Sequence, residues 1–149
     1  LTYLFHNYLY KSMKFYEILS HTADLRIKAT GTVMAELFAA GLEGVCHILK
    51  PGFDFTKEPD IYIEIEVSSF DISSLFVDFL AEALFIMHSE KLLLAAANMS
   101  FGGAKSLHAV CAGYKADMFD KDVKAITYHE AEIITNSSGL IECTIVPDI

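Results

Sequence analysis

Residues 61–68, with the sequence IYIEIEVS, place the strongest constraint on the fold, because apolar and polar side chains alternate there at every position. Successive side chains of a β-strand point to opposite faces, so this pattern predicts a strand with one buried face and one wet face. Residues 25–30 (LRIKAT) repeat the pattern, and residues 15–19 (FYEIL) are typical of a short strand. The chain must therefore build a sheet and cover one side of it.

Apolar residues recur at near-helical spacing between residues 33 and 49, which predicts a helix. Thr32 is the predicted N-cap of this helix. Gly41 and Gly44 lower its intrinsic propensity, and we interpret them as places where the helix approaches the sheet closely.

A second helix is predicted to begin after Asp71, a good N-cap residue, and to reach about His88. Further strands are predicted at residues 92–96, 107–112, 124–135 and 140–146, the last pair joined by a turn at residues 136–139. The order β-β-α-β-α-β-β-β-β predicts a single α+β domain, with a mostly antiparallel or mixed sheet packed against two helices. We assign this domain to residues 13–149 and treat residues 1–12 as an N-terminal extension.

Charge and cysteine content restrict the classes of function. Eleven Lys and Arg against 20 Asp and Glu give a formal net charge of −9, which suits a basic protein partner or cations better than a nucleic-acid backbone. The three cysteines are far apart and lack metal-ligand spacing, which predicts reduced core residues in a cytoplasmic protein. No apolar run reaches the roughly 18 residues of a membrane span, and residues 1–12 lack the features of a signal peptide.

Carboxylates at one early break and at the chain end are candidate metal ligands. Asp24 closes the segment between the first two predicted strands, and Asp148 lies beside the α-carboxylate of Ile149. If the fold brings these groups together, three hard-oxygen donors converge on a site for Ca²⁺ or Mg²⁺. His21 and Asp24 could also form a metal pair or a catalytic dyad, although an Asx-turn is the commoner meaning of this spacing.

Asp78 and Glu82 lie four residues apart on one stripe of the second helix. They could ligate a cation or accept a basic residue from a partner, and a solvated helix edge is the plain alternative. Lys124 opens an apolar strand, where it could be a counter-ion, a phosphate contact or an ordinary strand-end lysine. Gly-x-Ser-x-Gly and phosphate-loop patterns are absent from the sequence.

Four segments together resemble the archease family: residues 16–24 (YEILSHTAD), 75–82 (LFVDFLAE), 123–129 (VKAITYH) and 145–149 (IVPDI). The resemblance implies a protein cofactor of the tRNA-splicing RNA ligase that is not itself an enzyme. Such a cofactor promotes metal- and GTP-dependent guanylylation of the ligase and supports multiple turnover, and it meets RNA only through the ligase.

The resemblance also implies a divalent-cation site, for Ca²⁺ or Mg²⁺, formed by Asp24, Asp148 and Ile149, and a functionally sensitive Lys124. The chain departs from the family pattern at Ala81, Tyr114 and Pro147. Because proline removes a ladder donor, the terminal strand is predicted to end early.

Three other functions remain open at this point. The chain could be a small metal-dependent hydrolase with His21 as the base. It could be a general chaperone-like assembly factor for RNA-processing enzymes, or a structural protein whose acidic end is merely solvated.

Overall fold

The computed structural model describes residues 13–20 and 24–149. Within them the chain forms eight strands and two helices. In chain order these are β1 (Lys14–Leu19), β2 (Arg26–Gly31), α2 (Met34–Leu49), β3 (Ile61–Ser68), α3 (Ile72–Glu90), β4 (Leu92–Gly102), β5 (Ser106–Lys115), β6 (Ala125–Thr127), β7 (Ile134–Thr135) and β8 (Ile141–Asp148).

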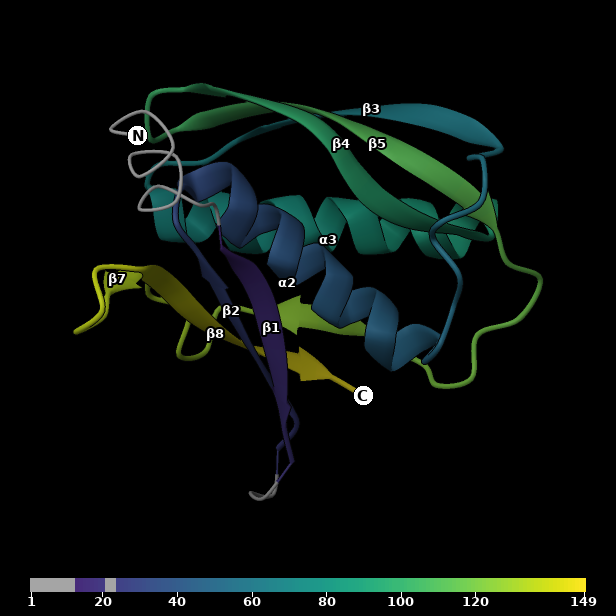
Figure 1. Ribbon diagram of the computed structural model, residues 1–149, viewed down its shortest axis with the longest axis horizontal. Helices are drawn as coiled ribbons and strands as arrows, with labels where there is room; N and C mark the ends of the chain where they lie inside the picture. Colours follow the sequence, from purple (N-terminus) through teal and green to yellow (C-terminus); the bar gives the residue numbers. More distant parts are fainter. Residues whose placement is uncertain (1–12, 21–23) are drawn as a thin grey trace, which may run out of the picture.

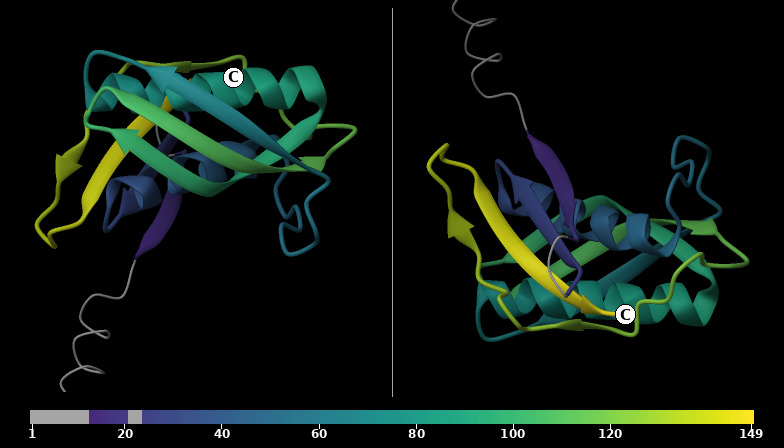
Figure 2. Two further views of the ribbon diagram at one scale, coloured as in Figure 1. Left: turned by 90° about the horizontal axis from the view of Figure 1, so that it is seen from above. Right: turned by 90° about the horizontal axis from the view of Figure 1, so that it is seen from below.

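Two antiparallel sheets enclose the helices, so the predicted α+β class with two helices is confirmed (Figure 1). One sheet has the order β1-β2-β8-β6, with β7 also pairing β8, and the other has the order β3-β5-β4. The prediction of one sheet was therefore wrong: both faces of the helix layer are apolar enough to need a sheet. Figure 2 shows the two sheets from opposite sides of the molecule.

The helices carry the centre of the core. Phe38 of α2 is fully buried, and its ring lies 4.9 Å from that of Phe76, 5.8 Å from Phe79 and 5.1 Å from Phe101. By length and composition α3 could cross a membrane, with a mean hydropathy of 1.4, but its apolar side is buried between the sheets, and core helices pass the same test.

The helix N-termini test the two capping predictions. Asp71 caps α3 as predicted, because its carboxylate accepts a hydrogen bond of 2.7 Å from the backbone N–H of Ser74. The Thr32 prediction was wrong, because the N-cap position is Val33. The Glu36 carboxylate instead accepts from the backbone N–H groups of Thr32 and Val33, at 2.9 and 3.2 Å.

Several strand bounds differ from the prediction. The predicted strand at 124–135 is divided into β6 and β7 by a turn in which Glu130 adopts φ 63°. β8 does not end before Pro147, which pairs with Ile126. Hydrogen bonds on either side of the proline, from Thr127 Oγ1 to Val146 O and from Lys124 N to Asp148 O, hold the strand in register.

Gly44 confirms the predicted close approach of α2 to the sheet, whereas Gly41 faces α3. A methyl group on Gly44 would lie 2.5 Å from Cγ2 of Ile27 in β2, and one on Gly41 would lie 2.5 Å from the ring of Phe76. Both positions therefore exclude a side chain for reasons of packing.

Gly44→Ala is expected to lower the free energy of unfolding by about 1–3 kcal/mol through overpacking against Ile27. The gain of about 1 kcal/mol in helix propensity does not offset this cost. Urea unfolding of the variant measures the change, with Ala39→Gly on the same helix as the control for propensity alone. An unchanged or higher stability of Gly44→Ala would contradict the close approach.

Candidate metal and partner site

The free end of β8 is held against the start of β6. Asp148 pairs with Ala125, and the backbone N–H of Lys124 donates a hydrogen bond of 2.7 Å to the carbonyl of Asp148. Asp148 and Ile149 are both exposed. The fold thus brings Lys124 beside the end of β8, although 24 positions separate Lys124 from Asp148 in the sequence.

On its other side β8 is flanked by β2, the strand that follows Asp24 in the chain. β2 pairs β8 in antiparallel register, from Gly31 opposite Ile141 to Ile27 opposite Ile145. The pairing ends there; if the register continued for three more residues on each strand, Asp24 would lie opposite Asp148. Asp24 is exposed and lies two residues before the start of β2. His21 lies outside the described residues.

A bidentate ion pair crosses this part of the sheet. Arg26 Nε donates to Glu130 Oε2 at 2.7 Å, and Arg26 Nη2 donates to Glu130 Oε1 at 3.0 Å. The hydrogen bond to Glu130 raises the pKa of Arg26, opposed by desolvation and aided by the charges of Glu130 and Asp24. Arg26 thus gives Asp24 a nearby positive charge, and Glu130 in turn compensates Arg26.

The Arg26–Glu130 pair makes stability depend on pH at the acid end. Hydrogen bonding to Arg26 lowers the pKa of Glu130 from its ordinary value. The contribution of Glu130 is therefore complete above the unfolded pKa of about 4.3, and it is lost as the pH falls through the lower folded pKa. Glu130→Gln is expected to lower Tm at pH 7, and the gap to the wild type should close toward pH 3. Thermal scans between pH 3 and 7 measure this gap, and a gap independent of pH would contradict the role of the carboxylate.

Asp78 is occupied by contacts within the protein. Its two carboxylate oxygens accept hydrogen bonds from Ser69 Oγ and from the hydroxyl of Tyr128. The hydrogen bond from Tyr128 to Asp78 is the main reason that the pKa of Tyr128 is raised, and desolvation of the hydroxyl adds to the shift. Asp78 therefore fastens α3 to the segment after β6, while Glu82 is exposed one turn further along α3.

The sequence predicts a donor set for a hard divalent cation: the Asp24 and Asp148 carboxylates and the terminal carboxylate of Ile149, all oxygen ligands of the kind that Ca²⁺ and Mg²⁺ prefer. In the described part of the chain no three His, Cys, Asp or Glu side chains gather closely enough to hold a metal ion. The metal site therefore stays a prediction.

The three cysteines take no part in such a site. Cys46, Cys111 and Cys143 are buried free thiols. Burial raises the pKa of Cys46 and Cys143 to about 12 and that of Cys111 to about 11. They are therefore protonated core residues at neutral pH, and neither thiolate ligands nor nucleophiles.

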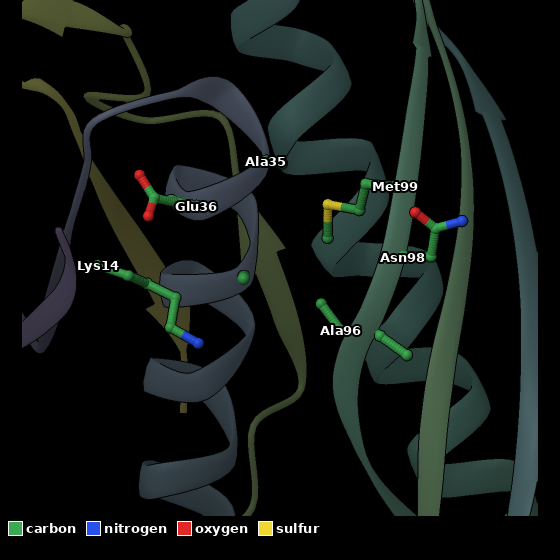
Figure 3. Close-up of a pocket in the computed structure, with 8 residues that line it drawn as sticks. Lys14, Ala35, Glu36, Ala96, Asn98 and Met99 are labelled. Atoms are coloured by element: carbon green, nitrogen blue, oxygen red, sulfur yellow. The ribbon is translucent and has the colours of Figure 1, made fainter. Parts of the chain in front are cut away.

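Two hollows lie along α2. Figure 3 shows the first, of about 470 Å³, between α2 and β4, with Lys14 and Glu36 at its rim. Lys14 Nζ pairs with Glu43 at 2.6 Å, and Glu36 caps α2. The second, of about 480 Å³, is lined by Tyr16, Glu43, His47, Lys50, Gly52, Phe53, Phe55, Leu94 and Ala95. None of the predicted site residues lines either hollow.

Arg26, Glu130 and Tyr128 were not among the residues predicted to have a function. Arg26 follows Asp24 by two positions, so two opposite charges lie close together in the sequence. That spacing is a usable signal. No sequence pattern links Glu130 to Arg26, since 104 residues separate them.

The model of the archease protein family matches residues 16–149. The chain is 30% identical over 135 residues to "Protein archease" of Methanosarcina barkeri, covering 85% of this chain and 90% of that protein. It is 28% identical over 144 residues to "Protein archease" of Pyrococcus furiosus, covering 92% and 100%. It is 30% identical over 140 residues to "Protein archease-like" of Drosophila melanogaster, covering 86% and 85%.

Two solved structures share the fold. The solution structure of Methanobacterium thermoautotrophicum protein 1598 aligns with a TM-score of 0.75 at 26% identity, covering 92% of this chain and all of that one. The crystal structure of a Thermotoga maritima archease, described as a possible chaperone, aligns with a TM-score of 0.58 at 17% identity, covering 89% and 96%. At that lower identity the likeness concerns the fold alone.

Proposed function

The chain belongs to the archease protein family, and on this premise we propose that it is a protein cofactor that activates a tRNA-splicing RNA ligase. In this role it binds a divalent cation at the end of β8 and promotes guanylylation and multiple turnover of the ligase. The protein itself carries out no bond-making step.

The contact between Lys124 and the chain terminus is the observation that carries the proposal. Lys124, Asp148 and Ile149 occupy one exposed sheet end next to β2, the strand that follows Asp24. These are the residues that the family resemblance implies as functional. Their exposure to solvent leaves them accessible to another molecule, which supports the proposal.

The chemistry assigns a role to each group. When bound, a divalent cation would supply positive charge that can orient a nucleoside triphosphate and neutralise the charge of its phosphates. Asp24, Asp148 and the Ile149 carboxylate would hold it. Lys124 provides a positive point charge beside the carboxylates, suited to a phosphate oxygen of the partner's nucleotide. Preferential binding to the guanylylation-competent state of the ligase would shift the ligase toward that state.

Single-turnover guanylylation of the cognate RNA ligase tests the proposal. Wild-type protein should accelerate transfer of GMP to the ligase, and Lys124→Ala should lose most of the acceleration. Lys105→Ala, in the turn between β4 and β5, is the matched control and should stimulate normally. No acceleration by the wild-type protein would refute the ligase role.

A chaperone-like assembly role is the second candidate. It is favoured by the words "possible chaperone" for the Thermotoga maritima relative and by exposed aromatic residues such as Phe70 and Phe85. This role predicts suppressed aggregation of unrelated client proteins, unaffected by changes at Asp24. A metal-dependent hydrolase would instead show turnover with no ligase present.

A further inference from the structure

A groove runs between α3 and the neighbouring strand β3, on the flank of the molecule away from the hollows over α2. It has a volume of about 420 Å³ and is lined by Glu66, Val67, Ser68, Asp78, Ala81, Glu82 and Phe85. We call these seven residues the α3 flank. Seen from above, β3 passes over α3 (Figure 2), and the two elements are in contact.

The α3 flank combines an exposed aromatic ring with acidic neighbours. Phe85 is 65% exposed, although it lies on a helix whose other aromatic residues are buried. Burial of a ring of this size against a partner is favourable, and such rings are typical anchors of protein interfaces. Phe85 therefore offers an apolar surface that residues 13–20 and 24–149 leave largely exposed.

The charge of the α3 flank has one sign. Glu66, Asp78 and Glu82 contribute three carboxylates, and none of the seven residues is Lys, Arg or His. Asp78 is engaged by Ser69 and Tyr128, whereas Glu66 and Glu82 are exposed. Glu66 lies on the exposed face of β3, with His108 opposite it on β5, and Glu82 lies on α3. A basic segment along this flank would therefore meet one exposed carboxylate on each element.

β3 adds a backbone feature to this surface. It pairs with β5 along its whole length and has no second strand neighbour in the described part of the chain. An edge strand of this kind can accept an extended segment through main-chain hydrogen bonds. Ile61 and Tyr62 at its start are also exposed apolar residues, so the edge is not protected by charge at that end.

We propose that the α3 flank is a docking site for an extended, positively charged protein segment. The segment runs along the edge of β3, with basic side chains beside Glu66 and Glu82 and an apolar side chain against Phe85. The opposite charges select a basic segment over an acidic one, and they increase the association rate at low salt.

The place of the α3 flank in the fold suggests which protein supplies the segment. Tyr128, which bonds Asp78, follows β6, and β6 leads back to Lys124 beside the terminus. One partner could therefore contact the groove and the end of β8 together. In naming that partner as the RNA ligase, the inference rests on the proposed function.

Binding of the cognate ligase to fluorescently labelled full-length protein tests the inference. Phe85→Ala should weaken binding about 10-fold, as expected for an aromatic anchor, and Glu82→Lys about 3–10-fold. Val33→Ala, an exposed apolar residue at the start of α2, and Glu58→Lys, which changes the net charge by the same amount as Glu82→Lys, are the controls and should bind normally. Raising the salt concentration should narrow the difference between Glu82→Lys and the wild type.

The outcomes separate this inference from the proposed function. If the wild type binds and stimulates the ligase while Phe85→Ala and Glu82→Lys bind equally well, the docking site is refuted and the function stands. If all variants fold but the wild type neither binds nor stimulates, both proposals fail. Equal losses in the test and control variants would also overturn the docking site, because they would show no preference for this surface.

Discussion

Asp148→Ala is expected to fold normally and to lose nearly all stimulation of ligase guanylylation. The side chain is exposed and its pairing in β8 uses backbone groups, so the fold does not depend on the carboxylate. Removing one of only three oxygen donors should lower divalent-cation affinity by about 100-fold or more, since changes to outer-shell partners alone typically cost 10–100-fold. Calorimetric titration with Ca²⁺ and Mg²⁺, together with single-turnover guanylylation, measures both effects.

Two further variants sharpen this test. Asp24→Ala should behave like Asp148→Ala if the β2–β8 register continues to the terminus, and a peptide tag after Ile149 should act similarly by removing the terminal carboxylate. Asp117→Ala, an exposed aspartate in the loop after β5, is the control and should retain full activity. Normal metal binding and stimulation by both Asp24→Ala and Asp148→Ala would eliminate the proposed metal site.

Phe38→Ala should produce the largest loss of stability. The ring is fully buried and packs against Phe76 and Phe79 of α3 and against Phe101 of β4. It therefore joins the two helices to the β3-β5-β4 sheet. Truncation leaves a cavity and should lower the free energy of unfolding by about 3–5 kcal/mol. For a chain of this size, Tm should fall by roughly 6–20 °C.

Phe85→Ala is the matched control for Phe38→Ala. It removes the same side chain from an exposed position on the adjacent helix, and stability should change by no more than about 0.5 kcal/mol. Urea and thermal unfolding under two-state conditions measure both variants. A loss below about 1 kcal/mol for Phe38→Ala would mean that the aromatic cluster is not the centre of the core.

Local patterns were sufficient where the physics is local. The alternation of apolar and polar residues at 61–68 correctly predicted β3, and Asp71 was correctly predicted to cap α3. Both features depend mainly on neighbouring residues. Prediction was wrong where a distant group competes. The Thr32 hydroxyl accepts a hydrogen bond from the backbone N–H of Met13 instead of capping α2, and pairing with β6 holds Pro147 of β8 in the sheet.

The candidate site shows the same division. Position in the chain by itself identified Asp24, Asp148 and Ile149 as candidate ligands, because carboxylates at a break and at a terminus can bind a cation. The functional role of Lys124 was implied by the family resemblance. Only the tertiary structure decided that Lys124 lies beside Asp148, that Arg26 pairs with Glu130, and that Asp78 is occupied by Tyr128. These contacts depend on antiparallel strand register over long sequence separations, and register is set by which faces of all the strands are buried together.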